Sequence, residues 1–277
     1  MISASGEDAW EFLQGQITQD ISGMQVGEAR YGFLLTQKGR VLGDVVVIFE
    51  SVEQLKLASW SLSPDILTDR LESYIIADDV ELADETPQWK GWQAAGSDVV
   101  SWLGQYRITS GAEFMGWAEA NALPPGSIRL LASTEPAWPD GWQSIGDLGF
   151  EVARVSAGIP QVPEDLGAGD FPQETGQEKV GVSFTKGCYL GQEVMARLAT
   201  TGRVRRQLRQ VQGTGCPPSE SGSPLDQNGK KVGELRSTVE TDAGRWIGLA
   251  MINLAHFGAS DPVSLPGGAI VEVLESA

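Results

Sequence analysis

The stretch KGCYLGQEVMAR, residues 186–197, is the most informative part of this sequence, because it contains a cysteine in a chain that has few cysteines. Cys188 is one of only two cysteines among 277 residues, and it follows a lysine and a glycine. Apolar residues recur at helical spacing from Leu190 to Leu198, which predicts a short helix beginning near Gly191. The thiol would then lie just before a helix N-terminus.

The residues alone leave two interpretations of Cys188 open. A cysteine under a glycine turn can be a small buried hydrophobic residue with no chemical role. Alternatively, Lys186 and the helix N-terminus can favour the reactive thiolate. Gln192 and Glu193 are similarly ambiguous. They can read the donor and acceptor edge of a heterocycle, or they can simply occupy a solvated first turn, where a carboxylate complements the helix dipole.

Positive charge gathers directly after this stretch. Five arginines lie within thirteen positions, namely Arg197, Arg203, Arg205, Arg206 and Arg209. If residues 203–209 form a strand, Arg203, Arg205 and Arg209 share one of its faces. Guanidinium groups bind carboxylates and phosphates. An anionic ligand tail, a short nucleic-acid contact and surface salt bridges would each account for the cluster.

Composition narrows the classes of function. The formal net charge is -17 and the pI is about 4.4, so the surface repels nucleic acid and anionic membranes. No apolar run approaches the length of a membrane span, and the first residues lack the features of a signal peptide. The two cysteines could form a disulfide, but a reducing compartment is the default. We expect a cytoplasmic protein with no stable nucleic-acid complex and no membrane association.

Several kinds of chemistry are disfavoured by residues that are scarce or missing. His256 is the single histidine, and the sequence contains no C-x-x-C pair, so we expect no resident metal site. A serine triad would have to use His256 without a G-x-S-x-G elbow. No glycine-rich phosphate loop occurs either.

The pattern of apolar and turn residues predicts a mixture of short helices and strands. We expect an amphipathic helix within residues 8–21, broken near Gly15, and then two strands joined by a turn at residues 37–40. Further strands are expected at residues 55–60 and 78–85. Between them, Ser63 and Pro64 predict the start of a helix. The apolar stripe of that helix would comprise Ile66, Leu67, Leu71, Tyr74 and Ile75.

The second half of the chain has a different pattern of predicted helices, loops and strands. Residues 89–142 predict short strands and helices, and residues 147–162 predict a helix that ends near Gly158. Residues 163–185 form a loop-rich connector whose length favours a functional role. From Arg203 onward, short strand-like segments separated by turn residues predict a small β-barrel or sandwich.

The longer motif VSFTKGCYLGQEVMAR, residues 182–197, closely resembles the signature of the YgfZ-type folate-binding proteins, which are relatives of the glycine-cleavage T-protein, an aminomethyltransferase. Four further segments resemble family elements and occur in the expected order: FLQGQITQD at 12–20, TQKGR at 36–40, RVSAGIP at 154–160 and FPQET at 171–175. The resemblance therefore spans most of the chain and is weakest at residues 89–142.

The resemblance implies an α+β fold with three domains around a central channel and a small C-terminal β-barrel. Its domains would be residues 1–50 with 142–202, residues 51–141 and residues 203–277. It implies binding of tetrahydrofolate or a one-carbon derivative, and a role in assembling or repairing iron–sulfur clusters, with effects on iron–sulfur enzymes including tRNA-modifying ones. The implied partners are folate and either iron–sulfur assembly proteins or client iron–sulfur enzymes.

The resemblance implies functional residues only at positions where this sequence matches the family motifs. The catalytic candidates are Cys188 and Lys186, and no metal ligands are assigned. The candidates for cofactor binding are Gln192, Glu193, Arg197, Tyr189, Glu174, Gln16 and Thr18.

One departure from the T-protein pattern bears on activity. T-proteins usually have R-L-E-x-G where this chain has Arg154-Val155-Ser156-Ala157-Gly158, and that glutamate helps to hold the pterin. Ser156 cannot replace the charge, so Glu174 or Glu193 would have to supply the carboxylate. We therefore expect an accessory protein, and keep a folate-dependent aminomethyltransferase or methyltransferase of the T-protein type as the alternative.

Overall fold

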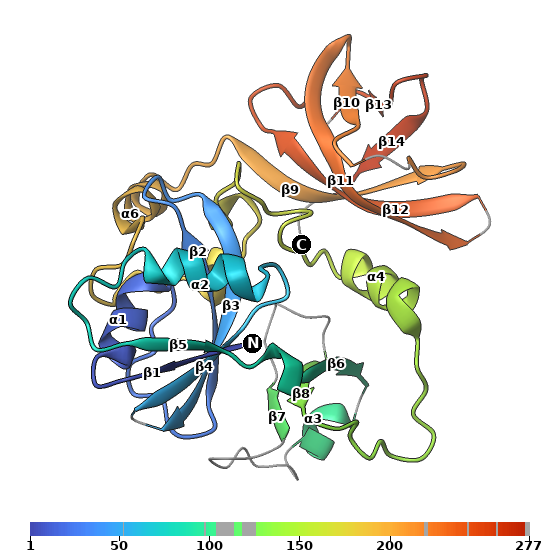
Figure 1. The fold of residues 1–277 in the computed structure, drawn as a ribbon. Helices are drawn as coiled ribbons and strands as arrows, with labels where there is room; N and C mark the ends of the chain where they lie inside the picture. The colour runs from blue at the N-terminus through green and yellow to red at the C-terminus, as the bar shows by residue number, and fades with distance from the viewer. Residues whose placement is uncertain are drawn as a thin grey trace. The chain divides into compact units, whose positions relative to one another are not determined.

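A computed structural model describes most of the chain as two compact units (Figure 1). The described residues are 1–51, 53–96, 98–103, 114–117, 126–218, 221–242, 244–258 and 260–274. Unit 1 comprises Met1–Gly141 and Gln177–Arg197, and unit 2 comprises Trp142–Gly176 and Leu198–Ala277. Across the described residues, no helix combines the length and the apolar character needed to cross a membrane.

Unit 1 is built on a five-stranded antiparallel sheet with the strand order β2-β3-β4-β1-β5. Its strands are β1 (Ile2–Ser5), β2 (Ala29–Leu35), β3 (Val41–Ser51), β4 (Gln54–Ala58) and β5 (Glu81–Asp84). The predicted hairpin between β2 and β3 is confirmed. Thr36 and Arg40 close its turn through a 2.8 Å backbone hydrogen bond, and Gly39 supplies the required positive φ of 72°. The predicted strands at 55–60 and 78–85 are confirmed as β4 and β5.

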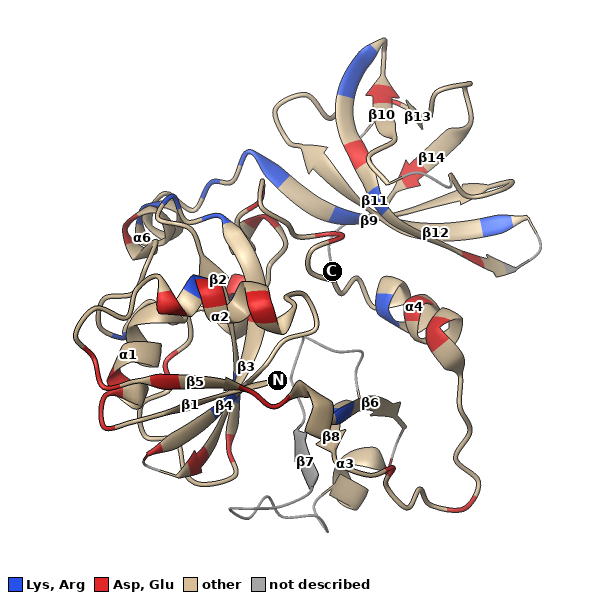
Figure 2. Ribbon diagram, viewed as in Figure 1, with Lys and Arg blue, Asp and Glu red and all other residues tan. Residues whose placement is uncertain are grey.

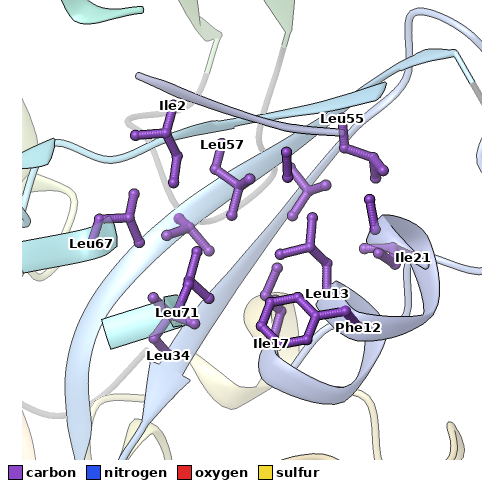
Figure 3. Packing of buried hydrophobic residues seen from close by; sticks show 14 of the residues in the cluster. Ile2, Phe12, Leu13, Ile17, Ile21, Leu34, Leu55, Leu57, Leu67 and Leu71 are labelled. Atoms are coloured by element: carbon purple, nitrogen blue, oxygen red, sulfur yellow. The ribbon is translucent and has the colours of Figure 1, made fainter. Parts of the chain in front are cut away.

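Two helices pack on this sheet and complete the core of unit 1, which Figure 3 shows from close by. They are α1 (Ala9–Gln16) and α2 (Pro64–Glu72). The buried core side chains include Ile2, Leu13, Ile17, Leu34, Leu55, Leu57, Leu67 and Leu71. Ser63 caps α2 by accepting a hydrogen bond from the amide of Ile66 at 3.4 Å, as predicted. The predicted stripe is wrong at Ile66, whose side chain is 57% exposed because the helix turns that position outward.

Among its described residues, the rest of unit 1 includes a three-stranded sheet and three short helices. The sheet has the order β6-β8-β7. Its strands are β6 (Lys90–Ala95), β7 (Phe114–Trp117) and β8 (Ser127–Ala132), and the helices are η1 (Thr86–Gln88), α3 (Val99–Leu103) and α5 (Glu178–Gly181). The short strands and helices predicted for residues 89–142 are thus confirmed where the chain is described, whereas residues 104–113 and 118–125 lie outside the described residues.

Unit 2 contains the predicted C-terminal barrel, which closes in the order β10-β11-β12-β9-β14-β13. The strands are β9 (Arg206–Thr214), β10 (Pro224–Gln227), β11 (Lys230–Asp242), β12 (Arg245–Asn253), β13 (Val263–Ser264) and β14 (Ile270–Val273). The buried indole of Trp246 fills part of the interior, and a Cβ at Gly213 would lie only 2.4 Å from it. That close approach explains the glycine in the middle of β9.

The connector before the barrel belongs to unit 2 as well. It contains α4 (Gly146–Ser156) and η2 (Pro172–Glu174). Val155 of α4 packs with Val239 and Leu249 of the barrel, and the side chain of Arg154 donates a 2.9 Å hydrogen bond to Ser237. The predicted helix ending near Gly158 is confirmed.

Packing therefore groups the chain differently from the predicted domains. The predicted boundary at residue 50 falls inside one sheet, because β4 pairs with both β3 and β1. Residues 142–176 group with the barrel rather than with the first fifty residues, since α4 buries its apolar face there.

Candidate functional site

Three motifs that are far apart in the sequence lie together in unit 1. They are the end of α1, the hairpin turn at residues 36–40, and residues 183–191, which we call the signature loop. The amide of Leu190 donates to the carbonyl of Gly15 at 3.1 Å. Gly191 has φ of 84°, and a Cβ there would lie 2.7 Å from the carbonyl oxygen of Thr36. The signature loop is thus held against both other motifs.

The signature loop continues into α6 (Gln192–Thr201), which confirms the predicted helix. Met195 is its buried side chain, while Leu190, Val194 and Leu198 are half-buried. Val194 lies against the hairpin, where a Cβ on Gly39 would be 3.1 Å from its own Cβ. Packing against that glycine turn fixes the position of the first turn of α6.

Cys188 is exposed and has a free thiol. Cys216 of unit 2 is likewise exposed and free. Wherever the chain is described, no group of three or more His, Cys, Asp or Glu side chains is placed to hold a metal ion.

Lys186 is buried, with 8% of its surface exposed, and its ammonium group faces backbone carbonyls. The Nζ atom donates to the carbonyl oxygens of Gln14 at 2.6 Å, Ile17 at 2.7 Å and Gln19 at 2.8 Å. Burial lowers the pKa of Lys186 to about 8, while the negative charge of Asp20 opposes that shift. The three donors of the ammonium group are thus directed to the last turn of α1 and to the segment that follows it, up to Gln19.

Tyr189 is the second buried residue of the signature loop, with 6% exposure. Its ring centroid lies 5.2 Å from the ammonium nitrogen of Lys186. Its hydroxyl is buried and has no hydrogen-bond partner among the described residues, and burial raises the pKa of Tyr189 to about 12. Because a buried hydroxyl without a partner is costly, this atom marks a place where a ligand or water would bind.

The polar residues of α6 are more open. Gln192 is half-buried, and its side-chain amide approaches the carbonyl of Lys186 at 3.5 Å. Glu193 in the first turn and Arg197 near the end of unit 1 are both exposed. A carboxylate and a guanidinium on one short helix can contact a ligand that carries both donor and anionic groups.

The two candidates near α1 have structural partners. The side-chain oxygen of Gln16 accepts a 3.1 Å hydrogen bond from Arg70. Thr18 is fully buried. Its hydroxyl donates to the carbonyl of Gly181 at 2.5 Å and accepts from the amide of Phe33 at 2.8 Å. Thr18 therefore joins α5 to β2, and its role in cofactor binding remains a prediction.

Glu174 lies in unit 2, where its carboxylate is engaged by Arg206. The Nε and Nη2 atoms of Arg206 lie 3.0 and 2.7 Å from the two carboxylate oxygens. The same guanidinium reaches the buried Asp170 at 2.9 Å, and Arg236 reaches Asp170 at 3.3 Å. This geometry gives Glu174 a role in holding the connector to the barrel, and leaves direct cofactor binding by Glu174 a prediction.

The arginine cluster differs from the expected one-faced strand. β9 begins only at Arg206, so Arg203 and Arg205 precede the strand as exposed residues. Figure 2 shows basic residues leading into β9 and acidic residues in the connector of the same unit. Because Arg206 is paired with carboxylates, the cluster is partly neutralised, which favours the salt-bridge explanation for that residue.

Comparison with known protein families finds matches for the N-terminal and C-terminal parts of the chain. Residues 1–133 match the GCVT N-terminal domain family, and residues 205–275 match the CAF17 C-terminal beta-barrel domain family. The crystal structure of the glycine cleavage system aminomethyltransferase T from Bartonella henselae superposes with a TM-score of 0.76 at 14% identity, covering 99% of this chain and 82% of that one. The likeness to that structure establishes the fold. The chain is thus similar to a GCVT N-terminal domain in its first 133 residues and to a CAF17 barrel domain at residues 205–275.

Two curated relatives resemble this chain over most of its length. A mitochondrial homolog of the iron-sulfur cluster assembly factor IBA57 from Cryptococcus neoformans is 29% identical over 244 residues. That match covers 76% of this chain and 63% of the relative, so the chain spans less than two thirds of that protein. The tRNA-modifying protein YgfZ of Yersinia pseudotuberculosis is 24% identical over 272 residues, covering 91% of this chain and 82% of the relative.

Compared with the T-protein pattern, the departure at Ser156 falls on an exposed position at the end of α4. Its carbonyl accepts a 2.9 Å hydrogen bond from the side chain of Gln210. The position therefore carries neither a charge nor a buried polar side chain in this protein.

Two carboxylates that sequence analysis missed are notable in unit 1. Asp44 of β3 is only 9% exposed, and it accepts hydrogen bonds from the hydroxyls of Tyr31 at 3.2 Å and Ser61 at 2.5 Å. Asp44 could have been recognised in the sequence, because it is an acidic residue within the apolar run VLGDVVVIF. Glu178 has one buried carboxylate oxygen without a partner among the described residues, and burial raises its pKa. No sequence pattern marked Glu178.

Proposed function

We propose that this protein is a tetrahydrofolate-binding accessory factor for the assembly or repair of iron–sulfur clusters. The observation that carries the proposal is the free, exposed thiol of Cys188 between two buried residues of the signature loop. The names of the curated relatives support the iron–sulfur part, because one is an iron-sulfur cluster assembly factor and another is a tRNA-modifying protein. Client enzymes would include iron–sulfur enzymes that modify tRNA.

Four features of unit 1 and of the ligand support folate binding. A pterin presents a ring N–H beside an exocyclic amine, which the exposed carboxylate of Glu193 can match. The anionic glutamate tail of folate suits the exposed guanidinium of Arg197. The hydroxyl of Tyr189 lacks a partner among the described residues and would gain one. Tetrahydrofolate, when bound, supplies a carrier for a one-carbon unit.

Cys188 would act as the reactive group of this site. A single thiolate can ligate iron transiently, with the remaining ligands supplied by an iron–sulfur assembly protein or a client enzyme. A reducing compartment such as the cytoplasm would keep both thiols free. A substitution at Cys188 tests the role of this thiol separately from folate binding.

Complementation of cells that lack this protein tests the role of the thiol. Cys188→Ala should fail to restore the activity of an iron–sulfur enzyme, whereas Cys216→Ala, which removes the other exposed thiol, should restore it fully. Equal expression and equal thermal unfolding of the two variants would show that folding is intact. Full complementation by Cys188→Ala would rule out the proposed chemistry.

An aminomethyltransferase remains the alternative, and it rests on the shared fold. The exposed Ser156 gives it no support, because the charge that T-proteins usually carry there is missing. Formation of methylenetetrahydrofolate from an aminomethyl donor by the purified protein would favour this alternative over the accessory role.

A further inference from the structure

Buried and exposed residues alternate in the signature loop, so its exposed residues must be held in place by their buried neighbours. Lys186 and Tyr189 are buried, whereas Gly187 and Cys188 between them are exposed. A loop tip of two residues, one of them glycine, has no packing of its own to fix its direction. The residues on either side must therefore determine how the thiol is presented.

The buried ammonium group of Lys186 is fully used by the protein. It has three hydrogen-bond donors, and three carbonyl oxygens, those of Gln14, Ile17 and Gln19, lie within 2.6 to 2.8 Å of its nitrogen. The side-chain oxygen of Gln14 adds a longer contact of 3.4 Å. A charged amine with no lone pair and no unused donor is poorly suited to exchange protons with a neighbouring thiol.

Of these three carbonyls, that of Gln14 lies in the last turn of α1, that of Ile17 at its C-cap and that of Gln19 three residues beyond the helix. The last carbonyl groups of a helix have no partner within that helix, and its C-terminus carries partial negative charge. α1 ends at Gln16 and has no basic residue in its last turn. Lys186, 172 positions downstream of Gln14, supplies the missing cation. The amide of Leu190 satisfies Gly15 in the same way at 3.1 Å.

We propose that Lys186 is a positioning residue, which caps the end of α1 and thereby holds the signature loop so that Cys188 is presented at a fixed place. The thiol lies two residues after one attachment to α1, at Lys186, and two residues before the other, at Leu190. This inference deepens the proposed function, because Cys188 is its reactive group, and it replaces thiol activation by Lys186 with control of geometry.

A single-thiol protein allows the test. In a Cys216→Ser background, Cys188 is the sole cysteine. It can be alkylated with iodoacetamide over a range of pH, or labelled with a nitroxide whose spectrum reports local motion. The test variants are Lys186→Met, which removes the charge and the donors, and Lys186→Arg, which keeps the charge. The planar guanidinium of arginine cannot converge on three carbonyls as an ammonium does. Lys179→Met, at an exposed lysine of α5, is the matched control.

The positioning role predicts the same outcome for both Lys186 variants. The nitroxide should become mobile, and the plateau rate of alkylation should rise by about twofold or more because the loop opens locally. The pH midpoint of alkylation should stay within about 0.3 of that of the parent, since the charge of Lys186 does not act on the thiol. Lys179→Met should change none of these quantities.

Two results would overturn the inference. One is an immobile nitroxide in both Lys186 variants. The other is a midpoint that rises by about one pH unit in Lys186→Met but not in Lys186→Arg, as expected if the lysine favours the thiolate by its charge. The experiment contains no folate, so a failure of folate binding would not change what it shows about Lys186.

If both variants fail to fold, the unmodified protein still decides the question. Three carbonyl partners should slow hydrogen exchange at the Lys186 ammonium group enough for its nitrogen-15 signal to be observed by NMR, unlike the signal of exposed Lys179. Exchange at Lys186 as fast as at Lys179 would contradict the positioning role.

Discussion

Asp20 shows how single residues support the site. Its carboxylate accepts hydrogen bonds from the amide of Ser22 at 2.9 Å and the side chain of Gln14 at 2.8 Å. A hydrogen bond from the side chain of Ser22, together with those from Gln14 and the Ser22 amide and a smaller contribution from the charge of Lys186, lowers the pKa of Asp20 to about 2. The carboxylate thus fixes the segment whose carbonyls receive the ammonium group of Lys186.

This shift makes a prediction about stability and pH. A depressed carboxyl pKa stabilises the fold above the unfolded pKa near 4, and that stabilisation is lost as the pH falls towards 2. Asp20→Asn should therefore lower the free energy of unfolding at pH 7 by about 1 kcal/mol, after allowance for solvent screening. Urea titrations from pH 7 to pH 3 should show this deficit shrinking to about half.

The matched control is Asp69→Asn on an exposed turn of α2, which should show no comparable dependence on pH. A deficit for Asp20→Asn that stays constant down to pH 3 would contradict the assigned cause of the shift.

At the scale of elements, two glycine turns let the signature loop and the hairpin meet. Gly39 at the hairpin tip and Gly191 before α6 both have positive φ, of 72° and 84°. Their backbones approach so closely that a Cβ on Gly191 would be 3.2 Å from the Cα of Gly39. Side chains at either position would separate the two motifs.

Gly191→Ala should accordingly destabilise unit 1 by about 2–4 kcal/mol, because it combines a strained backbone with a contact of 2.7 Å to the carbonyl of Thr36. Gly187→Ala in the same loop is the control, since nothing lies within 4 Å of its Cβ position. Chemical denaturation followed by circular dichroism would measure both. Equal effects of the two substitutions would show that the close approach is not important.

At the scale of the whole molecule, elements marked by local signals could be predicted from the sequence. Ser63 and Pro64 specify the start of α2 through a cap and a fixed φ. The polar–glycine turn specifies the hairpin between β2 and β3, and short strands separated by turns specify a barrel. Each of these signals acts over a few residues, so pattern analysis can detect it.

Long-range partners could not be predicted in the same way. The carbonyl of Gln14 meets Lys186, and Glu174 meets Arg206, 32 positions away. Neither pairing leaves a periodic pattern. The sequence therefore identified Lys186 as a candidate residue, but assigned it to the thiol rather than to the end of α1. Grouping of residues 142–176 with the barrel likewise depends on packing between α4 and the barrel strands.

Titration of tetrahydrofolate into the purified protein by isothermal calorimetry tests the central claim most directly. We predict saturable binding with a Kd below about 0.1 mM. Tyr189→Phe should weaken it by about tenfold, because the bound folate loses the hydrogen bond with the Tyr189 hydroxyl. Tyr74→Phe, outside the signature loop, should bind like the parent. No saturable binding up to about 1 mM would contradict the claim that this protein binds folate.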